Sequence, residues 1–326
     1  MFSYQRGTVL PKGLMLSCSR YVAAMRDSHP TNGRIYVVIP VLNRWHQTRT
    51  CLQHLKSSTY KTFRIIIADH GSTDETTQAL RDLYPEVMHI HADPSLWWAG
   101  ATNIGIREAL KHGAERIVLL NNDCYLKSDT LTKLLHHAEN HPGAIIAPVQ
   151  QHLDNGAIRI VRAGSCFLAG YPTMVLPWHT RHVGEPRVLR TRLIIGGRGV
   201  LIPRTVFDVV GLFDETRLPH YGADHDFYLR CRKLGIPLYV AADATVELDS
   251  SHTTLATRVG NLTMRQFCAT LTERRSHRNL HDLATLFRLH YPIPGLWRAG
   301  VGLNLARYIL IYLAARSLRL LTSRGH

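Results

Sequence analysis

The segment Leu119-Leu120-Asn121-Asn122-Asp123 brings together the residue types that hold a hard metal ion. An apolar run ends in two carboxamides and a carboxylate, and such a run bounded by polar residues is typical of a buried strand. The three oxygen-bearing side chains would then stand at the carboxyl end of a strand, where open α/β sheets bind their ligands. Such oxygens suit Mg²⁺ or Mn²⁺, which are commonly shared with substrate phosphates. Asn and Asp also cap helices and form turns, so the triplet alone leaves a plain strand-to-loop turn open.

The surrounding sequence predicts the strands and helices that would position this triplet. Strands are expected at 35–39, where Pro40 should break the first of them, and at 63–68, 89–90, 116–120, 144–149, 194–202 and 238–241. Helices are expected at 45–56, 75–83, 99–112, 131–141, 204–210 and 223–234. The alternation of strands and helices up to Asp123 is typical of a parallel, doubly wound α/β sheet, and the continuous apolar strands indicate that both faces are covered.

Length and composition allow one large domain with an appendage. The chain has 326 residues, of which 45% are hydrophobic, and this is enough for a sizeable core. We divide it into an irregular leader at 1–33, an α/β domain at 34–250 and a C-terminal helical region at 251–326, where the sequence becomes rich in Arg, His and Leu.

Charge limits the partners that the chain could have. The formal net charge is +15 without counting 20 histidines, and the pI is about 9.9. This balance predicts attraction to nucleic acid, to anionic lipid or to a phosphorylated substrate. The basic residues form no single block, and no motif interleaves aromatic and basic residues. We therefore expect no nucleic-acid partner, and keep a basic nucleic-acid-binding protein as the weaker alternative.

Cysteine usage and hydropathy favour a reducing compartment and no membrane span. The six cysteines are widely spaced and form no C-x-x-C pair, which argues against a zinc site or a disulfide framework. Polar residues interrupt the N-terminal stretch where a signal peptide would need an apolar core. No stretch reaches ~18 apolar residues without a charge, so no spanning helix is expected.

Four segments, taken in their order along the chain, carry a family resemblance. They are VVIPVLNR at 37–44, IADHGSTD at 67–74, NND at 121–123, and GLFDE at 211–215 followed by YGADHD at 221–226. This set is similar to the motifs of inverting family-2 glycosyltransferases of the GT-A fold, close to the rhamnosyltransferase-like branch. The resemblance covers residues 34–250 and implies a Rossmann-like, mostly parallel sheet flanked by helices. It also implies metal-dependent transfer of a sugar from a nucleotide-diphosphate donor to a glycan or lipid-linked saccharide acceptor.

The resemblance assigns the nucleotide to the loops after the first two strands. Pro40 and Asn43 lie in the loop that contacts the base and ribose in the family, and Asp69 matches the aspartate that accepts hydrogen bonds from the base. Asn43 could equally cap the following helix. For Asp69 the capping alternative is weaker, since Ser72 and Asp74 are better placed as caps. The residue after Asp69, usually Asp or Asn in the family, is histidine here.

The segment 96–105 resembles the Gly-rich loop and helix start that precede the metal-binding strand in the family. Small residues such as Gly100 let backbone amides approach a phosphate or a sugar. We expect Trp98 at the donor site and its neighbour in the core, with core packing of both as the alternative. Asn103 is expected to face the nucleotide sugar. Arg198, in the glycine-rich stretch 196–199, would contact the diphosphate or an anionic acceptor, unless it is a surface arginine.

The same resemblance gives the metal ligands. Asp123 matches the last carboxylate of the family's Asp-x-Asp motif, Asn121 stands at its first position, and Asn122 lies between them towards the nucleotide sugar. One carboxylate together with diphosphate oxygens can hold Mn²⁺ or Mg²⁺, and the ion offsets charge on the leaving diphosphate. His252 stands where some members place a further metal ligand after the last strand.

The predicted helix at 223–234 carries the expected general base. In the family a Glu-Asp pair opens this helix, and its aspartate takes the proton of the acceptor hydroxyl. Here the pair is Ala223-Asp224, so the carboxylate is kept and the glutamate is lost. Asp226 should point to a different face, and a negatively charged first helix turn is the alternative for both aspartates. The lost glutamate also leaves open a non-catalytic homologue that only binds the sugar nucleotide.

The tail at 297–321 mixes apolar residues with arginines. A basic amphipathic helix is typical of binding to an anionic membrane surface. We expect it to hold a cytoplasmic enzyme at the inner face of the cell membrane, where lipid-linked acceptors would lie. The alternatives are a helix packed onto the catalytic domain or onto a homodimer partner.

Overall fold

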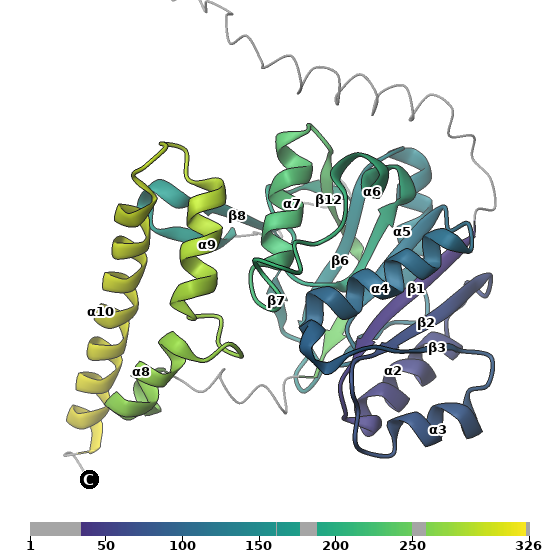
Figure 1. Cartoon of the computed structure of the whole chain (residues 1–326), viewed down its shortest axis with the longest axis horizontal. Coiled ribbons are helices and arrows are strands. Elements are labelled where there is room, and N and C mark those ends of the chain that lie inside the picture. The colour runs from purple at the N-terminus through teal and green to yellow at the C-terminus, as the bar shows by residue number, and fades with distance from the viewer. Residues whose placement is uncertain (1–33, 161, 177–187, 250–258, 324–326) are drawn as a thin grey trace, which may run out of the picture.

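The computed structural model describes residues 34–160, 162–176, 188–249 and 259–323. A ten-stranded sheet runs through this part of the chain, with helices against both faces (Figure 1). Eight strands follow the order β10-β12-β6-β11-β4-β1-β2-β3, while β5 pairs with β12 and β7 with β6. The strands are β1 (Ile35–Val41), β2 (Phe63–Asp69), β3 (Met88–His91), β4 (Arg116–Leu120), β5 (Cys124–Leu126), β6 (Ile145–His152), β7 (Ile158–Ile160), β10 (Val188–Arg190), β11 (Arg198–Pro203) and β12 (Leu238–Leu248).

The connections are mostly helical, as the sequence predicts. The helices are α2 (Trp45–Lys56), α3 (Thr76–Leu83), α4 (Trp97–Lys111), α5 (Thr130–Asn140), α6 (Arg204–Val210), α7 (Ala223–Lys233), α8 (Met264–Thr272), α9 (Leu280–His290) and α10 (Trp297–Ser323). Short 3-10 turns η1 (Pro94–Leu96), η2 (Phe167–Ala169) and η4 (Val259–Asn261) complete them. The predicted bounds of α2, α6 and β4 match, and most other predicted elements shift by one to three residues at an end.

The half of the sheet before residue 121 is parallel and doubly wound. β1 pairs with β2 and β4, and β2 pairs with β3, all in parallel. The strand order reverses beside β1, and ligands of open α/β sheets bind in the crevice at such a reversal. The loops after β1, β2 and β4 all emerge at this edge, so the predicted α/β class with a mostly parallel sheet is confirmed.

The second half is mixed rather than parallel. β11 runs antiparallel between β4 and β6, whereas β6 and β12 are parallel to each other. β12 extends to Leu248, seven residues beyond the predicted end at Ala241, and its register against β6 shifts between Ala241 and Thr245. The apolar pattern is lost at this irregularity, which is why the sequence prediction ends there.

Pro40 does not end β1, contrary to the prediction. The strand continues to Val41, and Pro40 pairs with Ala68 in the register of β2. The Val41 carbonyl accepts a hydrogen bond from the His70 N–H, on the β2 side, so the backbone of Pro40 points towards β4. The pairing of β1 with β4 stops at Val38, so residue 40 has no partner on that side. Proline, which lacks an N–H, can therefore stand there without loss of a hydrogen bond between the strands.

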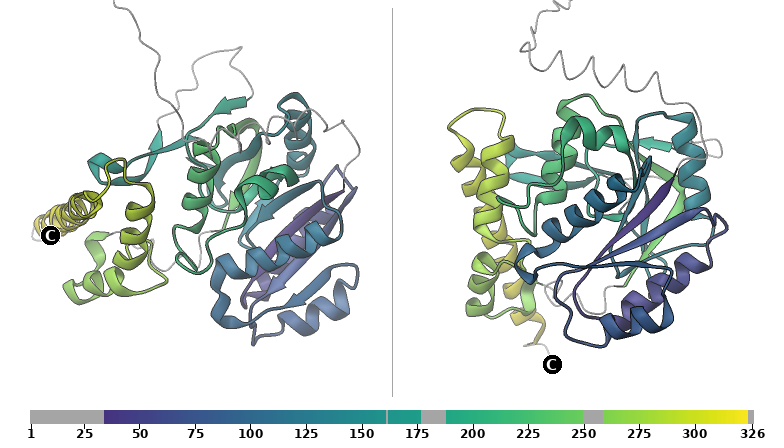
Figure 2. Two further views of the ribbon diagram at one scale, coloured as in Figure 1. Left: turned by 45° about the horizontal axis from the view of Figure 1, so that its top comes forward. Right: turned by 45° about the vertical axis from the view of Figure 1, so that its right-hand side comes forward.

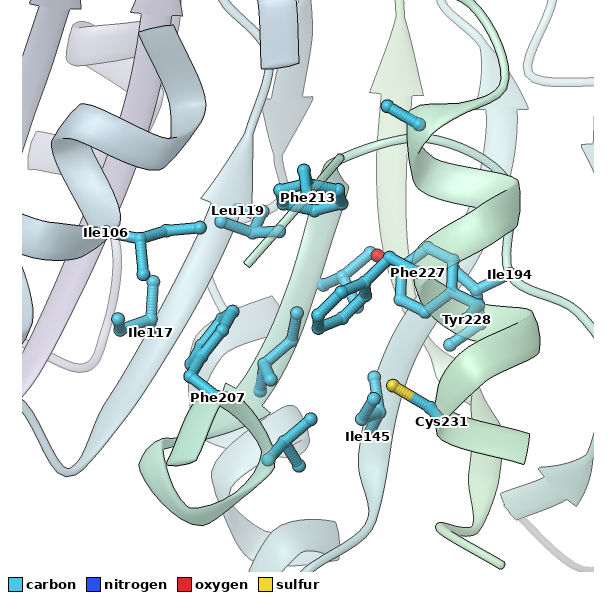
Figure 3. Close-up of a cluster of buried hydrophobic side chains, with 14 of the residues drawn as sticks. Ile106, Ile117, Leu119, Ile145, Ile194, Phe207, Phe213, Phe227, Tyr228 and Cys231 are labelled. Carbon is cyan, nitrogen blue, oxygen red and sulfur yellow. The ribbon is translucent and has the colours of Figure 1, made fainter. Parts of the chain in front are cut away.

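Two buried apolar clusters cover the two faces of the sheet. Successive residues of β1 contribute to opposite clusters, with Tyr36 and Val38 in one and Val37 and Ile39 in the other. The first cluster joins α4, α6 and α7 to the sheet, and Figure 3 shows its aromatic centre, where Phe213 and Phe227 lie with ring centroids 4.7 Å apart. This packing fixes the start of α7 against the strand ends.

The C-terminal helices form a group beside the sheet domain (Figure 2). They pack against the hairpin of β8 (Arg162–Cys166) and β9 (Tyr171–Leu176), which the sequence did not predict. Phe287 of α9 contacts Phe167 edge-on at 5.1 Å and belongs to the same buried cluster as α7. Among the described residues, no helix combines the length and the apolar character needed to cross a bilayer. The division of the chain at residue 250 stays a prediction.

Candidate active site

The loops after β1 and β2 are tied together by Asn43. Its side-chain oxygen accepts hydrogen bonds from the N–H groups of Thr73 (2.7 Å) and Asp74 (3.3 Å), and its own N–H donates to Ser72 Oγ at 2.7 Å. Asn43 therefore does not cap α2. The N–H of Trp45 donates to Asp74 Oδ2 at 3.0 Å, so the cap comes from the neighbouring loop. Three hydrogen bonds of Asn43 therefore connect the two loops that are expected to hold the nucleotide base and ribose.

Asp69 ends β2 as a buried carboxylate, only 1% exposed. It accepts hydrogen bonds from the Ser72 N–H (2.8 Å), the Thr77 hydroxyl (3.2 Å) and His89 Nε2 (3.3 Å). Burial alone would raise the pKa of Asp69, but these hydrogen bonds outweigh it and hold the pKa well below the usual range. Asp69 is thus an ionised acceptor at the strand edge, while its role towards a base stays a prediction.

A second group of ligand-type side chains lies beside Asp69. Asp69, His89 and His91 have one potential ligand atom each within 4.8 Å of one another. The two histidines stand at alternate positions of β3, so they share a face, and His91 pairs with Asp69 in register. This trio lies away from the predicted triplet after β4 and was not predicted.

Asp123 is the half-buried carboxylate of the predicted metal site. Its backbone carbonyl accepts a hydrogen bond from the Asp249 N–H at 3.0 Å, which brings the ends of β12 and β4 together. Asp249 Oδ2 accepts hydrogen bonds from Gln47 Nε2 and the Tyr125 hydroxyl, both at 3.1 Å. The two aspartates offer only oxygen donors, and this donor chemistry fits Mn²⁺ or Mg²⁺. Asp249 was missed because the predicted last strand stopped at Ala241.

The two asparagines of the triplet have protein partners. Asn121 Oδ1 accepts a hydrogen bond from the indole N–H of Trp98 at 2.9 Å, and the Asn122 side-chain N–H₂ donates to Thr48 Oγ1 at 3.0 Å. Asn121 therefore orients Trp98, and its role as a metal ligand stays a prediction. His252, the other predicted ligand, lies outside the described residues.

Trp98 is half-buried between this triplet and the aromatic cluster, with its ring 5.3 Å from that of Phe213. Its neighbour Trp97 is half-buried too, so neither tryptophan is a fully buried core residue. Trp97 has a positive φ of 52°, a conformation that is costly for a bulky residue and that recurs at functional sites. A Cβ at Gly197 would stand 3.1 Å from the Trp98 ring, so the glycine allows this close packing.

Asn103 and Gly100 both have structural contacts within the protein. Asn103 is fully buried; its side chain donates to the Phe213 carbonyl at 2.9 Å and accepts from the Phe213 N–H at 3.0 Å. It clamps the loop before α7 with both ends of its amide, and a contact with the nucleotide sugar stays a prediction. A Cβ at Gly100 would lie 2.8 Å from the Leu96 side chain, so close packing accounts for this glycine.

Arg198 begins β11 and is not a free surface residue. Its guanidinium donates to Gln150 Oε1 at 2.7 Å, and Gln150 in turn donates to the Ile195 carbonyl at 2.9 Å. The positive charge of Arg198 acts to lower the pKa of both Tyr221 and His225, so the guanidinium lies near the start of α7. Whether it contacts a diphosphate or an acceptor stays a prediction.

Asp224 stands in the first turn of α7 and is held on both oxygens. Oδ2 accepts the Gly196 N–H at 2.6 Å, and Oδ1 faces His225 Nδ1 at 2.9 Å. Burial would raise the pKa of Asp224, but the charge and hydrogen bond of His225 and the Gly196 N–H lower it to about 2. Burial would likewise lower the pKa of His225, yet Asp224 raises it overall. The two side chains form a hydrogen-bonded pair that is ionic when His225 is protonated, and Thr173 of β9 bonds the other ring nitrogen.

The neighbours of Asp224 explain two features of the motif. Ala223 is fully buried, so the present packing leaves no room for the glutamate usual in the family. Asp226 points to a different face of the helix, as predicted, where it pairs with Arg230 and with His290 of α9, each at 2.8 Å. His225 was missed because one histidine among 20 gives no signal without its contacts.

Comparisons with known proteins agree with this arrangement. Residues 36–175 match the family model of Glycosyl transferase family 2. The chain is 24% identical over 216 residues to the dTDP-rhamnosyl transferase RfbF of Shigella flexneri, covering 65% of this chain and 68% of the relative. It is 26% identical over 249 residues to the N-acetylglucosaminyl-diphospho-decaprenol L-rhamnosyltransferase of Mycobacterium tuberculosis, covering 71% and 78%.

The fold has solved counterparts. The mannosyltransferase PcManGT from Pyrobaculum calidifontis, solved in complex with GDP-Man and Mn²⁺, superimposes with a TM-score of 0.54 at 15% identity, covering 96% of this chain and 87% of that one. At this identity the likeness concerns the fold, which is of the GT-A type. The match of residues 36–175 to the family-2 model and the rhamnosyltransferase relatives together identify the chain as a glycosyltransferase that carries a family-2-like domain.

Proposed function

We propose that the protein is a metal-dependent, inverting glycosyltransferase that moves a sugar from a nucleotide-diphosphate donor to a glycan or lipid-linked acceptor. The observation that carries this proposal is the position of Asp224. Its ionised carboxylate, held by the Gly196 N–H and His225, stands at the start of α7 near Arg198, which begins the strand beside β4. An inverting transfer needs one such carboxylate to receive the acceptor proton.

The proposed roles follow the chemistry of each group. Asp69 accepts hydrogen bonds from the base, and Trp98 lies against the sugar or diphosphate. Asp123 and Asp249 would hold Mn²⁺ or Mg²⁺, which, when bound, offsets the charge of the leaving diphosphate. Asp224, with a pKa of about 2, is fully ionised at neutral pH. It receives the proton as the acceptor oxygen bonds to the sugar and becomes acidic.

The relatives suggest the first donors and acceptors to test. Both are named as rhamnosyl transferases, and the mycobacterial relative's name contains a lipid diphosphate acceptor. We propose a deoxyhexosyl or hexosyl donor and an acceptor at the inner membrane face, reached by peripheral association through α10. Arginines lie along this helix, and it exposes Leu303, Leu310 and Leu313.

The experiment is a calorimetric screen of nucleotide-diphosphate sugars with Mn²⁺ present, followed by an assay of nucleoside-diphosphate release. Donor binding that needs the metal, together with turnover, supports the proposal. If the donor binds but is neither transferred nor slowly hydrolysed, the protein is instead a non-catalytic sugar-nucleotide-binding protein.

A further inference from the structure

A basic connection between α8 and α9 reaches the active site. Residues 273–279 form a compact loop in which Asn279 donates to the Thr272 carbonyl at 2.8 Å and caps α9. Arg278 is 7% exposed, and its guanidinium lies over the Tyr308 ring of α10 at 5.8 Å. The loop is therefore fixed to the C-terminal helices, and it presents Arg274 and Arg275 outwards.

Both arginines lie over Trp97 at the start of α4. The guanidinium carbons of Arg274 and Arg275 are 5.8 and 5.9 Å from its ring centroid, within the range of cation–π contacts. The Trp97 ring lies 5.6 Å from that of His220, which precedes α7 and the Asp224 carboxylate. The loop before α9, the start of α4 and the segment before α7 are far apart in the sequence but meet near the proposed base.

This cluster gathers the positive charge of two arginines that, among the described residues, are not engaged in ion pairs. Across the ranges that the structure describes, no carboxylate forms an ion pair with Arg274 or Arg275, and both are exposed. Asp282 feels the charge of Arg274, but burial keeps the pKa of Asp282 above its usual value. Burial, together with the charges of Arg275 and His70, lowers the pKa of His220 to about 4.

Two buried nitrogens in the cluster have no hydrogen-bond partner. They are Nδ1 of His220 and Nδ1 of His70, a side chain that is 7% exposed and follows Asp69. Polar atoms left unpaired in a buried place are costly and call for an explanation. Arginine forks paired with aromatic and histidine groups suit phosphate oxygens.

We infer that Arg274 and Arg275, with Trp97 and His220, bind a phosphate or diphosphate group carried by the acceptor. The inference rests on the proposed function and names the acceptor class: a saccharide linked to a phosphorylated carrier. The charge of Asp224 acts on the pKa of His220 in this cluster and on that of Tyr221, which also feels Arg198 and Asp123, so the carboxylate lies near both parts of the site. In an inverting displacement the acceptor hydroxyl attacks the sugar carbon from the side opposite the leaving diphosphate, so the base that takes its proton should lie on the acceptor side.

The test compares Arg274→Gln/Arg275→Gln with Arg265→Gln/Arg288→Gln in the full chain. The control removes two exposed arginines from the same helical region, without touching Trp97. The first readout is calorimetric binding of inorganic pyrophosphate in the presence of a metal chelator. We expect the first variant to lose roughly tenfold or more in affinity, and the control to bind as wild type does. Equal affinity in all three proteins overturns the inference.

The second readout separates acceptor from donor. The KM for a saccharide carried on an alkyl diphosphate should rise roughly tenfold in Arg274→Gln/Arg275→Gln, while the KM for the same saccharide as an alkyl glycoside and the donor dissociation constant stay unchanged. An equal loss of donor affinity would assign the arginines to the donor and overturn the inference. Pyrophosphate binding needs no turnover, so a protein without transfer activity but with arginine-dependent binding would refute the proposed function and keep the anion site.

Discussion

At the scale of single residues, the two key carboxylates differ in their surroundings. Asp123 is half-buried, and among the described residues its carboxylate accepts a side-chain hydrogen bond only from its neighbour Cys124, whose Sγ lies 3.4 Å from Oδ1. Asp224 has a protein donor on each oxygen. The Asp123 carboxylate can thus accept a cation, whereas hydrogen bonds fix the position of the Asp224 carboxylate and keep it ionised. Their substitutions should therefore affect different steps.

Asp123→Ala should remove the metal-dependent part of nucleotide binding and leave the fold intact. The reason is that it deletes a carboxylate suited to a hard cation shared with the diphosphate. Calorimetry with a nucleoside diphosphate, with Mn²⁺ and then with chelator, measures the effect. Asp129→Ala, which removes a surface aspartate paired with Lys133, is the control. Full wild-type binding or activity in chelator would contradict the metal assignment.

Asp224→Asn should lower the turnover rate with little change in donor affinity. Asparagine keeps the size of the side chain but cannot take the proton, and losing a general base typically costs ~10²–10⁴ in rate. Steady-state transfer to a competent acceptor is measured beside calorimetric donor binding. Asp208→Asn, on the exposed side of α6, should transfer normally. Wild-type turnover in Asp224→Asn would remove this carboxylate from the mechanism.

The Asp224–His225 pair predicts a pH window of stability. The lowered pKa of Asp224 contributes stability above its unfolded value, and this is lost as pH falls through about 2. The raised pKa of His225 contributes stability below its unfolded value, and this is lost as pH rises through the folded pKa. With unfolded pKa values of about 3.9 and 6.5, His225→Asn should reduce the melting temperature most between these pH values.

Melting curves from pH 4 to 9 test this window, with exposed His46→Asn as the control. The difference between wild type and His225→Asn should shrink at alkaline pH, while His46→Asn should show no such profile. A difference that grows with pH would mean that the pair is not ionic.

At the scale of elements, the parallel half of the sheet was predictable and the rest was not. Continuous apolar strands such as β4 can be recognised from their hydrophobic pattern, and the ends of these strands predict where the ligand-binding loops lie. Short strands such as β5 and β7, with three residues each, carry none. The irregularity in β12 hid Asp249, and the partners of Asn103 and Asn121 depend on long-range contacts that no local pattern encodes.

Asn103→Ala tests one of these contacts. It leaves the buried N–H of Phe213 without a partner and removes one of the two hydrogen bonds to the Phe213 carbonyl, and should destabilise the fold by about 1–3 kcal/mol. Asn140→Ala, at the exposed end of α5, should change stability by no more than about 0.5 kcal/mol. Urea unfolding measures both variants. Equal midpoints would show that the clamp on the loop before α7 contributes nothing.

At the scale of the whole molecule, α10 carries an exposed apolar stripe. Leu303, Ala306, Leu310, Leu313 and Ala314 are all exposed and recur at the spacing of one helix face. The opposite side packs inwards through Asn304 and through Tyr312, which is buried against the Phe267 ring at 4.4 Å. The helix therefore needs no rearrangement to present the stripe.

Leu303→Gln/Leu310→Gln/Leu313→Gln should release the protein from anionic vesicles and leave donor binding unchanged. Membrane-surface binding scales with buried apolar area together with attraction between basic residues and anionic lipid. Vesicle flotation of wild type and variant, with neutral vesicles as the comparison, measures it. Truncation after Pro292 should have the same effect on vesicle binding. If wild type does not float with anionic vesicles, the membrane assignment is wrong.

The link between Asp226 and His290 limits how this enzyme could be recombined with its relatives. The helix that carries the proposed base is bonded through Asp226 to the last residue of α9, and both side chains are 3% exposed. A chimera that takes its C-terminal region from another glycosyltransferase would separate a buried carboxylate from its imidazole partner, which is strongly destabilising. Crossover points for exchanging acceptor preference should therefore lie after His290, or both partners should be transplanted as a unit.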